Sequence, residues 1–398
     1  MRPRWFLLAV LFCGLAFSAR GQIKQADTTY YRSIIPTEKQ SLLSNIDFIA
    51  NQQYAFRNEF EDGEYTGSRF RMEQFRMEFR GYVTPKIFFR FRHRFTSGFE
   101  PQSKDKIIKG VDMAYVAFML GSSEKWEVQV GKFCVDWGGI EFDLNPIDIY
   151  EYSDIIEQAD NFLSGVGAKY HVNASNYIGF QVYNARTQNY EEIYGNDSIV
   201  GNAGIVESRL PLGGVLTWRG SLWNGKVATL WSYSLTNEAS GIFKNYVALG
   251  QQLNLRHLTI AYDYKISNED LDRTGIISNE IPRSDFEFVL RETLYRSHWL
   301  RIDWEFVPKW HLAFVGFIDR AQWLDDEDPL KDTNDIRMGY GYIPTVEYYP
   351  WDEINLKFFL GYVGRSVRYS DYAKNRIGLE DFNSGRVMIG LISPLKFL

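Results

Sequence analysis

The 398-residue chain has 44 basic and 50 acidic residues, a net charge of −6, and only two cysteines. This acidic balance excludes a general nucleic-acid partner, because binding to a phosphate backbone requires a basic surface. Cys13 lies in a segment that we expect to be removed, so Cys134 has no partner for an intramolecular disulfide. The mature fold must therefore be stabilised in another way.

The first residues predict an export signal. Arg2 and Arg4 precede an uninterrupted run of apolar and small residues from 5 to 17, and small residues at 19 and 21 mark a cleavage site. This is the layout of a secretory signal peptide over residues 1–21. The run is also too short to span a bilayer, which takes about 20 residues. Its removal leaves 41 basic residues against the 50 acidic ones.

Downstream of the signal, apolar and polar residues alternate in a way that predicts β-strands. The pattern is clear in residues 126–131, 258–265, 300–306 and 354–361. A period of two places the two sets of side chains on opposite faces of a strand. Every apolar stretch after residue 21 is broken by polar residues, so no transmembrane helix is predicted. An exported chain of this kind is a soluble periplasmic protein, a secreted protein or a membrane β-barrel.

The connections between these strands alternate between short and long, which favours the barrel. Turns of a few residues are expected near 83–86, 121–125, 173–175, 223–225, 254–257, 307–309 and 350–352. Membrane barrels sort their loops in this manner, with short turns in the periplasm and long loops outside, whereas a soluble sandwich has no reason to do so. The expected long loops are 59–68, 98–109, 133–163, 187–210, 237–243, 267–286, 321–337 and 370–384.

Counting strands between these connections gives about 16, from a first strand near 47–58 to a last near 385–398. Bacterial barrels have an even number, and closing the sheet leaves no edge exposed to lipid. We therefore predict an all-β fold, a transmembrane antiparallel β-barrel over residues 47–398. A short periplasmic segment, residues 22–46, would precede it.

Tryptophan and tyrosine residues gather near the predicted strand ends. Such clusters are typical of the aromatic girdles that barrels place at both membrane interfaces, although ordinary hairpin cores are the alternative. The residues concerned are Trp218, Trp223, Trp231, Tyr233, Trp299, Trp304, Trp310, Tyr348, Tyr349 and Trp351.

Two neighbouring predicted strands carry arginines on one face. In residues 87–95 arginines alternate with apolar residues, apart from His93, and residues 75–80 repeat the theme. An arginine facing lipid at mid-membrane costs about 2–4 kcal/mol, so the arginines should face the lumen and guide anions. The alternative is an ordinary polar wall, balanced by acids such as Glu78. The predicted patch consists of Arg76, Arg80, Arg90, Arg92 and Arg94.

The longest connection, residues 133–163, is expected to be the third extracellular loop, and it has no Lys or Arg between 134 and 160. If it folds into the lumen, its carboxylates would face the arginine patch and create a field that favours small polar or zwitterionic solutes. The alternatives are a solvated outer loop and a divalent-cation site without recognisable ligand spacing. The candidate constriction residues are Asp136, Glu141, Asp143, Asp148, Glu151 and Asp154.

Short motifs around this loop carry a family resemblance. Gly131-Lys132-Phe133, Trp137-Gly138-Gly139 and the stretch from Asn145 to Asp154 (NPIDIYEYSD) resemble porins of Bacteroidetes-type bacteria that are related to the phosphate-selective porins O and P. The resemblance implies a 16-stranded trimeric porin with an inward third loop. Phosphate-selective members also use lysines on inward loops, whereas this loop is acidic and lysine-free beyond Lys132.

The sequence therefore predicts a water-filled pore in the outer membrane of a Gram-negative bacterium, in contact with outer-membrane lipid and lipopolysaccharide. It would pass small hydrophilic or anionic solutes by passive diffusion, as a homotrimer without cofactor or metal. No catalytic residues are expected, because the histidines are scattered and the neighbours Ser297 and His298 point to opposite faces of a strand. A barrel enzyme of protease or phospholipase type and a structural or adhesin barrel remain as alternatives.

Overall fold

The computed structural model describes residues 45–96, 109–194, 205–281, 289–325 and 331–397. The expected signal peptide, 1–21, and nearly all of the expected periplasmic segment, 22–46, lie outside the described residues. The strands are β1 (Ile46–Glu61), β2 (Glu64–Thr84), β3 (Ile87–Arg94), β4 (Val111–Leu120), β5 (Trp126–Cys134), β6 (Phe162–Asn173), β7 (Asn176–Asn184), β8 (Leu212–Leu222), β9 (Val227–Ala239), β10 (Ile242–Asn254), β11 (Leu258–Leu271), β12 (Arg291–Val307), β13 (Trp310–Trp323), β14 (Asp335–Tyr348), β15 (Lys357–Tyr369) and β16 (Phe382–Lys396). Short helical turns are α1 (Ile140–Asp143), η2 (Pro146–Asp148), α2 (Asp154–Glu157), α3 (Tyr190–Tyr194) and η3 (Ala373–Ile377).

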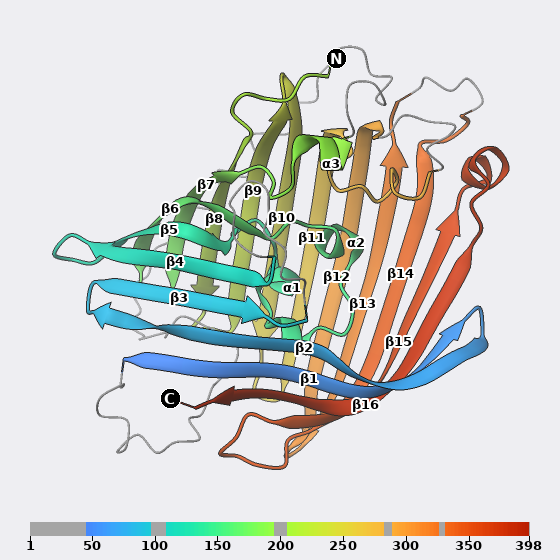
Figure 1. Cartoon of the computed structure of the whole chain (residues 1–398). Coiled ribbons are helices and arrows are strands. Elements are labelled where there is room, and N and C mark those ends of the chain that lie inside the picture. The colour runs from blue at the N-terminus through green and yellow to red at the C-terminus, as the bar shows by residue number, and fades with distance from the viewer. Residues whose placement is uncertain (1–44, 97–108, 195–204, 282–288, 326–330, 398) are drawn as a thin grey trace.

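The sixteen strands form one closed antiparallel barrel, as predicted (Figure 1). Each strand pairs with its neighbours in sequence, and β1 closes the ring by pairing with β16 from Ile49–Lys396 to Glu61–Ser384. Closure gives every strand two hydrogen-bonded neighbours, which is how a sheet satisfies its backbone in lipid. Within the described ranges, every helix is too short or too polar to cross a membrane.

The long connections lie largely where the sequence predicted them. Five of them are found at 135–161, 185–211, 272–290, 324–334 and 370–381, and the segment 98–109 falls almost entirely outside the described residues. The prediction is wrong for 59–68 and 237–243, where two-residue turns join β1 to β2 and β9 to β10.

The first of these turns explains the error. Asp62 and Gly63 both have positive φ angles, 47° and 87°, as tight hairpin turns require. The polar residues that suggested a loop instead extend the two strands and pair across them, as Arg57 does with Glu73 at 3.3 Å. Polarity alone therefore cannot separate a loop from a strand that continues past the membrane.

The alternation within each strand separates a lipid face from an interior face. On β13, Leu312, Phe314 and Ile318 are 40–45% exposed, whereas the interleaved Val315 and Phe317 are buried. Exposed tryptophans also lie in or beside the short turns, as Trp223, Trp310 and Trp351 do. The apolar outer band with aromatic ends is the pattern expected of a membrane barrel.

Candidate functional site

The third extracellular connection, residues 135–161, lies inside the ring of strands, and we call it the L3 loop. Its short helices contact strands on opposite sides of the barrel: α1 contacts β10 and β11, α2 contacts β12, and η2 contacts β1, β2 and β16. Figure 1 shows α1 and α2 within the ring. The L3 loop therefore crosses the lumen and divides it.

Apolar side chains hold the L3 loop against one side of the barrel. Ile140 and Ile147 are buried in one cluster with inward-facing aromatic residues of β12, β13 and β15, namely Trp299, Phe317 and Phe359. Full burial of an isoleucine stabilises by about 1.5–3 kcal/mol. The interior near β9 to β16 is thus packed like a protein core, and open space remains on the side of β2 to β8.

Two aspartates of the wall bind the backbone of the L3 loop. Asp263 on β11 accepts hydrogen bonds from the amides of Ile140 and Glu141, both at 2.8 Å, and Asp319 on β13 accepts one from the amide of Asp154 at 2.9 Å. These amides lie at helix starts, where they have no partner within the helix. The wall therefore satisfies the loop's backbone and fixes its position.

The candidate carboxylates of the L3 loop are paired, but not with the predicted arginine patch. Each of five carboxylates contacts a basic residue on β8, β11, β14, β15 or β16, and only Asp136 and Asp143 of the six candidates line the main cavity. The pairs are Glu141 with Lys265, Asp143 with Arg219, Asp148 with Lys357, Glu151 with Arg386, and Asp154 with Arg337 and Arg365. The expected opposition to the patch is therefore limited to Asp136 and Asp143, and the other four acids do not take part in it.

The five predicted arginines line one wall of the cavity together. β2 and β3 pair in the register Arg76–Arg94, Glu78–Arg92 and Arg80–Arg90, which brings the side chains into a single patch. Glu78 and Asp112, which lies on β4, supply most of the negative charge that neutralises these arginines. Asp112 is fully buried and lies 3.1 Å from Arg76 and 3.3 Å from both Arg92 and Arg94.

The main cavity lies between this wall and the L3 loop and has a volume of about 830 Å³. Ten lysine or arginine residues line it, against six aspartate or glutamate residues. The basic residues that the sequence analysis did not identify as pore-lining are Lys109, Lys132, Lys169, Arg219 and Arg273. They come from separate strands and loops, so no local run of sequence connects them.

Two acids of the L3 loop differ from ordinary carboxylates. Burial raises the pKa of Asp136, although Lys169 and Arg219 oppose the shift. Burial and then the neighbouring Glu151 raise the pKa of Glu157. Both side chains line the cavity, so on acidification the cavity begins to lose negative charge at a higher pH than it would with ordinary carboxylates.

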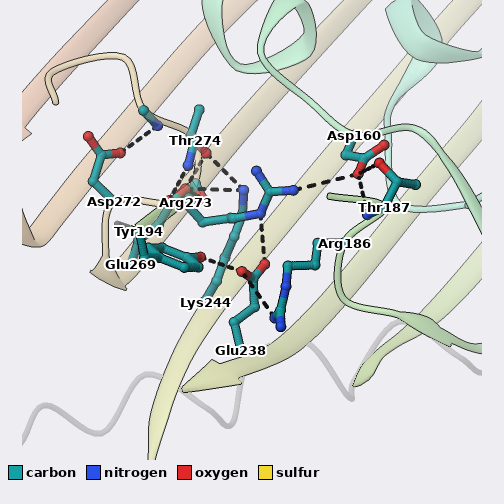
Figure 2. A network of polar contacts seen from close by, with 12 residues as sticks. Asp160, Arg186, Thr187, Tyr194, Glu238, Lys244, Glu269, Asp272, Arg273 and Thr274 are labelled. Carbon is teal, nitrogen blue, oxygen red and sulfur yellow. Dashed lines mark hydrogen bonds and ion pairs between the residues drawn. The ribbon is translucent and has the colours of Figure 1, made fainter. Parts of the chain in front are cut away.

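A second polar network ties the end of the L3 loop to two other extracellular loops (Figure 2). The Asp160 carboxylate accepts hydrogen bonds from the amide and hydroxyl of Thr187, at 3.1 and 2.9 Å, and lies 3.6 Å from Arg273. Arg273 in turn donates to Glu238 of β9 at 2.7 Å. The network makes the outer end of the L3 loop part of a connected extracellular rim.

Several solved barrels have the same fold. The outer membrane channel DcaP of Acinetobacter baumannii has a TM-score of 0.57 at 10% identity, covering 88% of this chain and 97% of that one. OprB of Pseudomonas putida gives 0.57 at 11% identity, with 90% and 96% covered. An anion-selective porin from Comamonas acidovorans gives 0.55 at 11% identity, with 88% and 99% covered.

A comparison with curated proteins found no match to this sequence. The sequence model of the family described as phosphate-selective porin O and P matches residues 49–292, which is more than half of the chain. The matched region contains both arginine-bearing strands and the whole L3 loop. The chain therefore belongs to the phosphate-selective porin O and P family, as an outer-membrane porin of a Gram-negative bacterium that allows passive diffusion of small hydrophilic solutes.

Proposed function

We propose that this porin prefers anions to cations, with the arginine patch as its principal selectivity surface. The observation that carries the proposal is the excess of ten basic over six acidic residues around the main cavity. Arginine keeps its charge at every relevant pH and offers several donors to an anion. Anions would therefore be concentrated in the cavity and cations repelled.

The pairing of the L3 loop strengthens this proposal. Glu141, Asp148, Glu151 and Asp154 do not line the main cavity, and each lies against a lysine or arginine of the wall. Charges neutralised in this way contribute little to the field at the solute path. The zwitterion preference that an acidic loop opposite the patch would produce is therefore not expected.

Reversal potentials in planar bilayers under a potassium chloride gradient test the proposal. Wild-type channels should favour chloride, and the combined replacement of Arg90, Arg92 and Arg94 by alanine should shift the potential toward cation preference. Arg320→Ala is a matched control, because Arg320 pairs with Asp335 at 2.6 Å and does not line the cavity. A wild-type channel without chloride preference, or a triple variant with an unchanged potential, would contradict the proposal.

We also propose a homotrimer in which β3, β4 and β5 face the neighbouring subunits. These strands have 8, 10 and 9 residues, against 13 to 17 for β9 to β14. Eight residues in a tilted strand rise roughly 20 Å, less than the apolar band of about 25 Å. Protein neighbours would cover this thinner side better than lipid. The mass of the detergent-solubilised particle, corrected for bound detergent, should equal three chains; a monomer mass would refute the trimer.

We expect no catalytic activity from this channel. Ser297 is fully buried on the inner face of β12, whereas His298 is exposed on the outer face, so this serine and histidine cannot act together. Protease and phospholipase assays on the purified protein in detergent should give no turnover, and turnover that tracks the protein through purification would favour the enzyme alternative.

A further inference from the structure

A second cavity adjoins the main one on the side of the periplasmic turns. This cavity has a volume of about 490 Å³ and is lined by residues of five periplasmic turns or their flanks, namely Pro85, Glu124, Ser175, Gly225 and Asn254. Eight residues line both this cavity and the main one, so the two meet at these side chains. They are Tyr82, Met119, Glu127, Asp143, Leu144, Tyr177, Arg219 and Leu230.

The chemistry of this junction differs from that of the main cavity. Five of its eight residues are apolar or aromatic, and Arg219 is the only basic one. Leu144 of the L3 loop is half-buried there, and Met119 projects from β4. A solute that leaves the basic main cavity through the second one therefore passes a slot with apolar sides.

Two of the three charged groups of the slot, Arg219 and Asp143, form a two-pronged pair, and the third, Glu127, pairs with Lys169 at 3.2 Å. The Arg219 guanidinium donates to both oxygens of Asp143, at 2.6 and 2.5 Å, and its Nε donates to the Tyr177 hydroxyl at 3.1 Å. Lys169 and Arg219 both lie against the Tyr177 ring, 5.4 and 5.9 Å from its centre. Both partners of the Arg219–Asp143 pair are partly exposed, so a solute carboxylate can approach the guanidinium from the cavity.

We propose that the junction favours small organic carboxylates bearing an apolar or aromatic group over inorganic phosphate. The carboxylate would pair with Arg219 while the apolar group lies against Leu144 and Met119. Phosphate would have to shed its hydration beside apolar side chains that offer no hydrogen bonds in return. This proposal rests on the anion preference proposed above and names the class of anion that the same pore passes best.

Permeability ratios from bi-ionic reversal potentials test it, with benzoate, acetate and phosphate each measured against chloride at pH 6, where phosphate is mostly a monoanion. We expect benzoate to exceed both acetate and phosphate at least several-fold in wild-type channels, although it is the largest of the three. Leu144→Asn and Met119→Gln should each reduce the benzoate-to-acetate ratio without changing the charge of the slot.

Met113→Gln is the matched control, because Met113 lies on the same strand but lines only the main cavity, and it should leave the ratio unchanged. The chloride-to-potassium ratio, measured in the same membranes, keeps the two proposals separate. If chloride is not preferred over potassium, the anion preference itself fails. If chloride is preferred but wild-type benzoate does not exceed acetate and phosphate, only the slot proposal is overturned, and this outcome does not depend on any variant folding.

Discussion

The buried pair of Lys265 and Glu141 gives the sharpest test of how the L3 loop is held. Both side chains are completely inaccessible to solvent and form an ion pair between β11 and α1. Glu141 also accepts hydrogen bonds from the amide and hydroxyl of Ser153, both at 2.7 Å. Lys265→Met would leave this carboxylate buried with only the serine as partner.

Removing one partner of a buried ion pair costs about 3–5 kcal/mol. The two hydrogen bonds from Ser153 place the expected cost near the lower end, about 3 kcal/mol, which shifts an equilibrium by roughly 150-fold. The loss falls on the contact between the loop and the wall. We therefore expect Lys265→Met to populate states in which the L3 loop leaves β11 and the lumen widens.

Single-channel recording in planar bilayers measures this directly, as higher conductance and greater open-channel noise. The double variant Lys265→Met with Glu141→Gln removes both charges and should recover most of the wild-type behaviour. Lys226→Met is the matched control, because Lys226 is exposed at a periplasmic turn. If Lys265→Met shows wild-type conductance and noise in the same recordings, the pair does not hold the loop and the reasoning is wrong.

Three further predictions concern charge and packing around the lumen. Asp112→Asn removes the acid shared by three arginines and should raise chloride preference. For ions about 5 Å away in water the energy changes by about 0.8 kcal/mol, with opposite sign for chloride and potassium, so their permeability ratio should change roughly 15-fold. An unchanged reversal potential would count against this. Lowering the pH from neutral should also raise chloride preference. Burial raises the pKa values of Asp136 and Glu157, so these two acids become neutral before ordinary carboxylates do. A chloride preference that falls on mild acidification would contradict this. Gly250→Ala should displace the L3 loop, because its new Cβ would lie 2.6 Å from Asp263 and 2.9 Å from the amide nitrogen of Ile140, at a cost of about 1–3 kcal/mol. Thermal unfolding and conductance check this change against Gly214→Ala, whose Cβ would meet nothing closer than 3.8 Å, and equal behaviour of the two variants would refute it.

The strands and most of the loops could be predicted from local sequence. A strand with one face to lipid and one to the lumen must alternate, and the cost of placing Arg90 or Arg92 in lipid fixes which face is which. The arginine patch followed from the same argument, because strands joined by a short turn must pair. The two tight turns were missed because polar side chains also occur where strands extend beyond the membrane, as Arg57 does on β1.

Local patterns along the chain were therefore sufficient to predict the barrel, its approximate strand count and the composition of one wall, since each depends on residues close together in the chain. The places where the acids of the L3 loop are neutralised became known only from the folded barrel. Glu141 meets Lys265 across 124 positions and Glu151 meets Arg386 across 235, separations for which alternation carries no information. The closed ring brings such residues together, because a loop that crosses the lumen can contact any strand of the barrel. The charge of the pore is thus a property of the assembled wall.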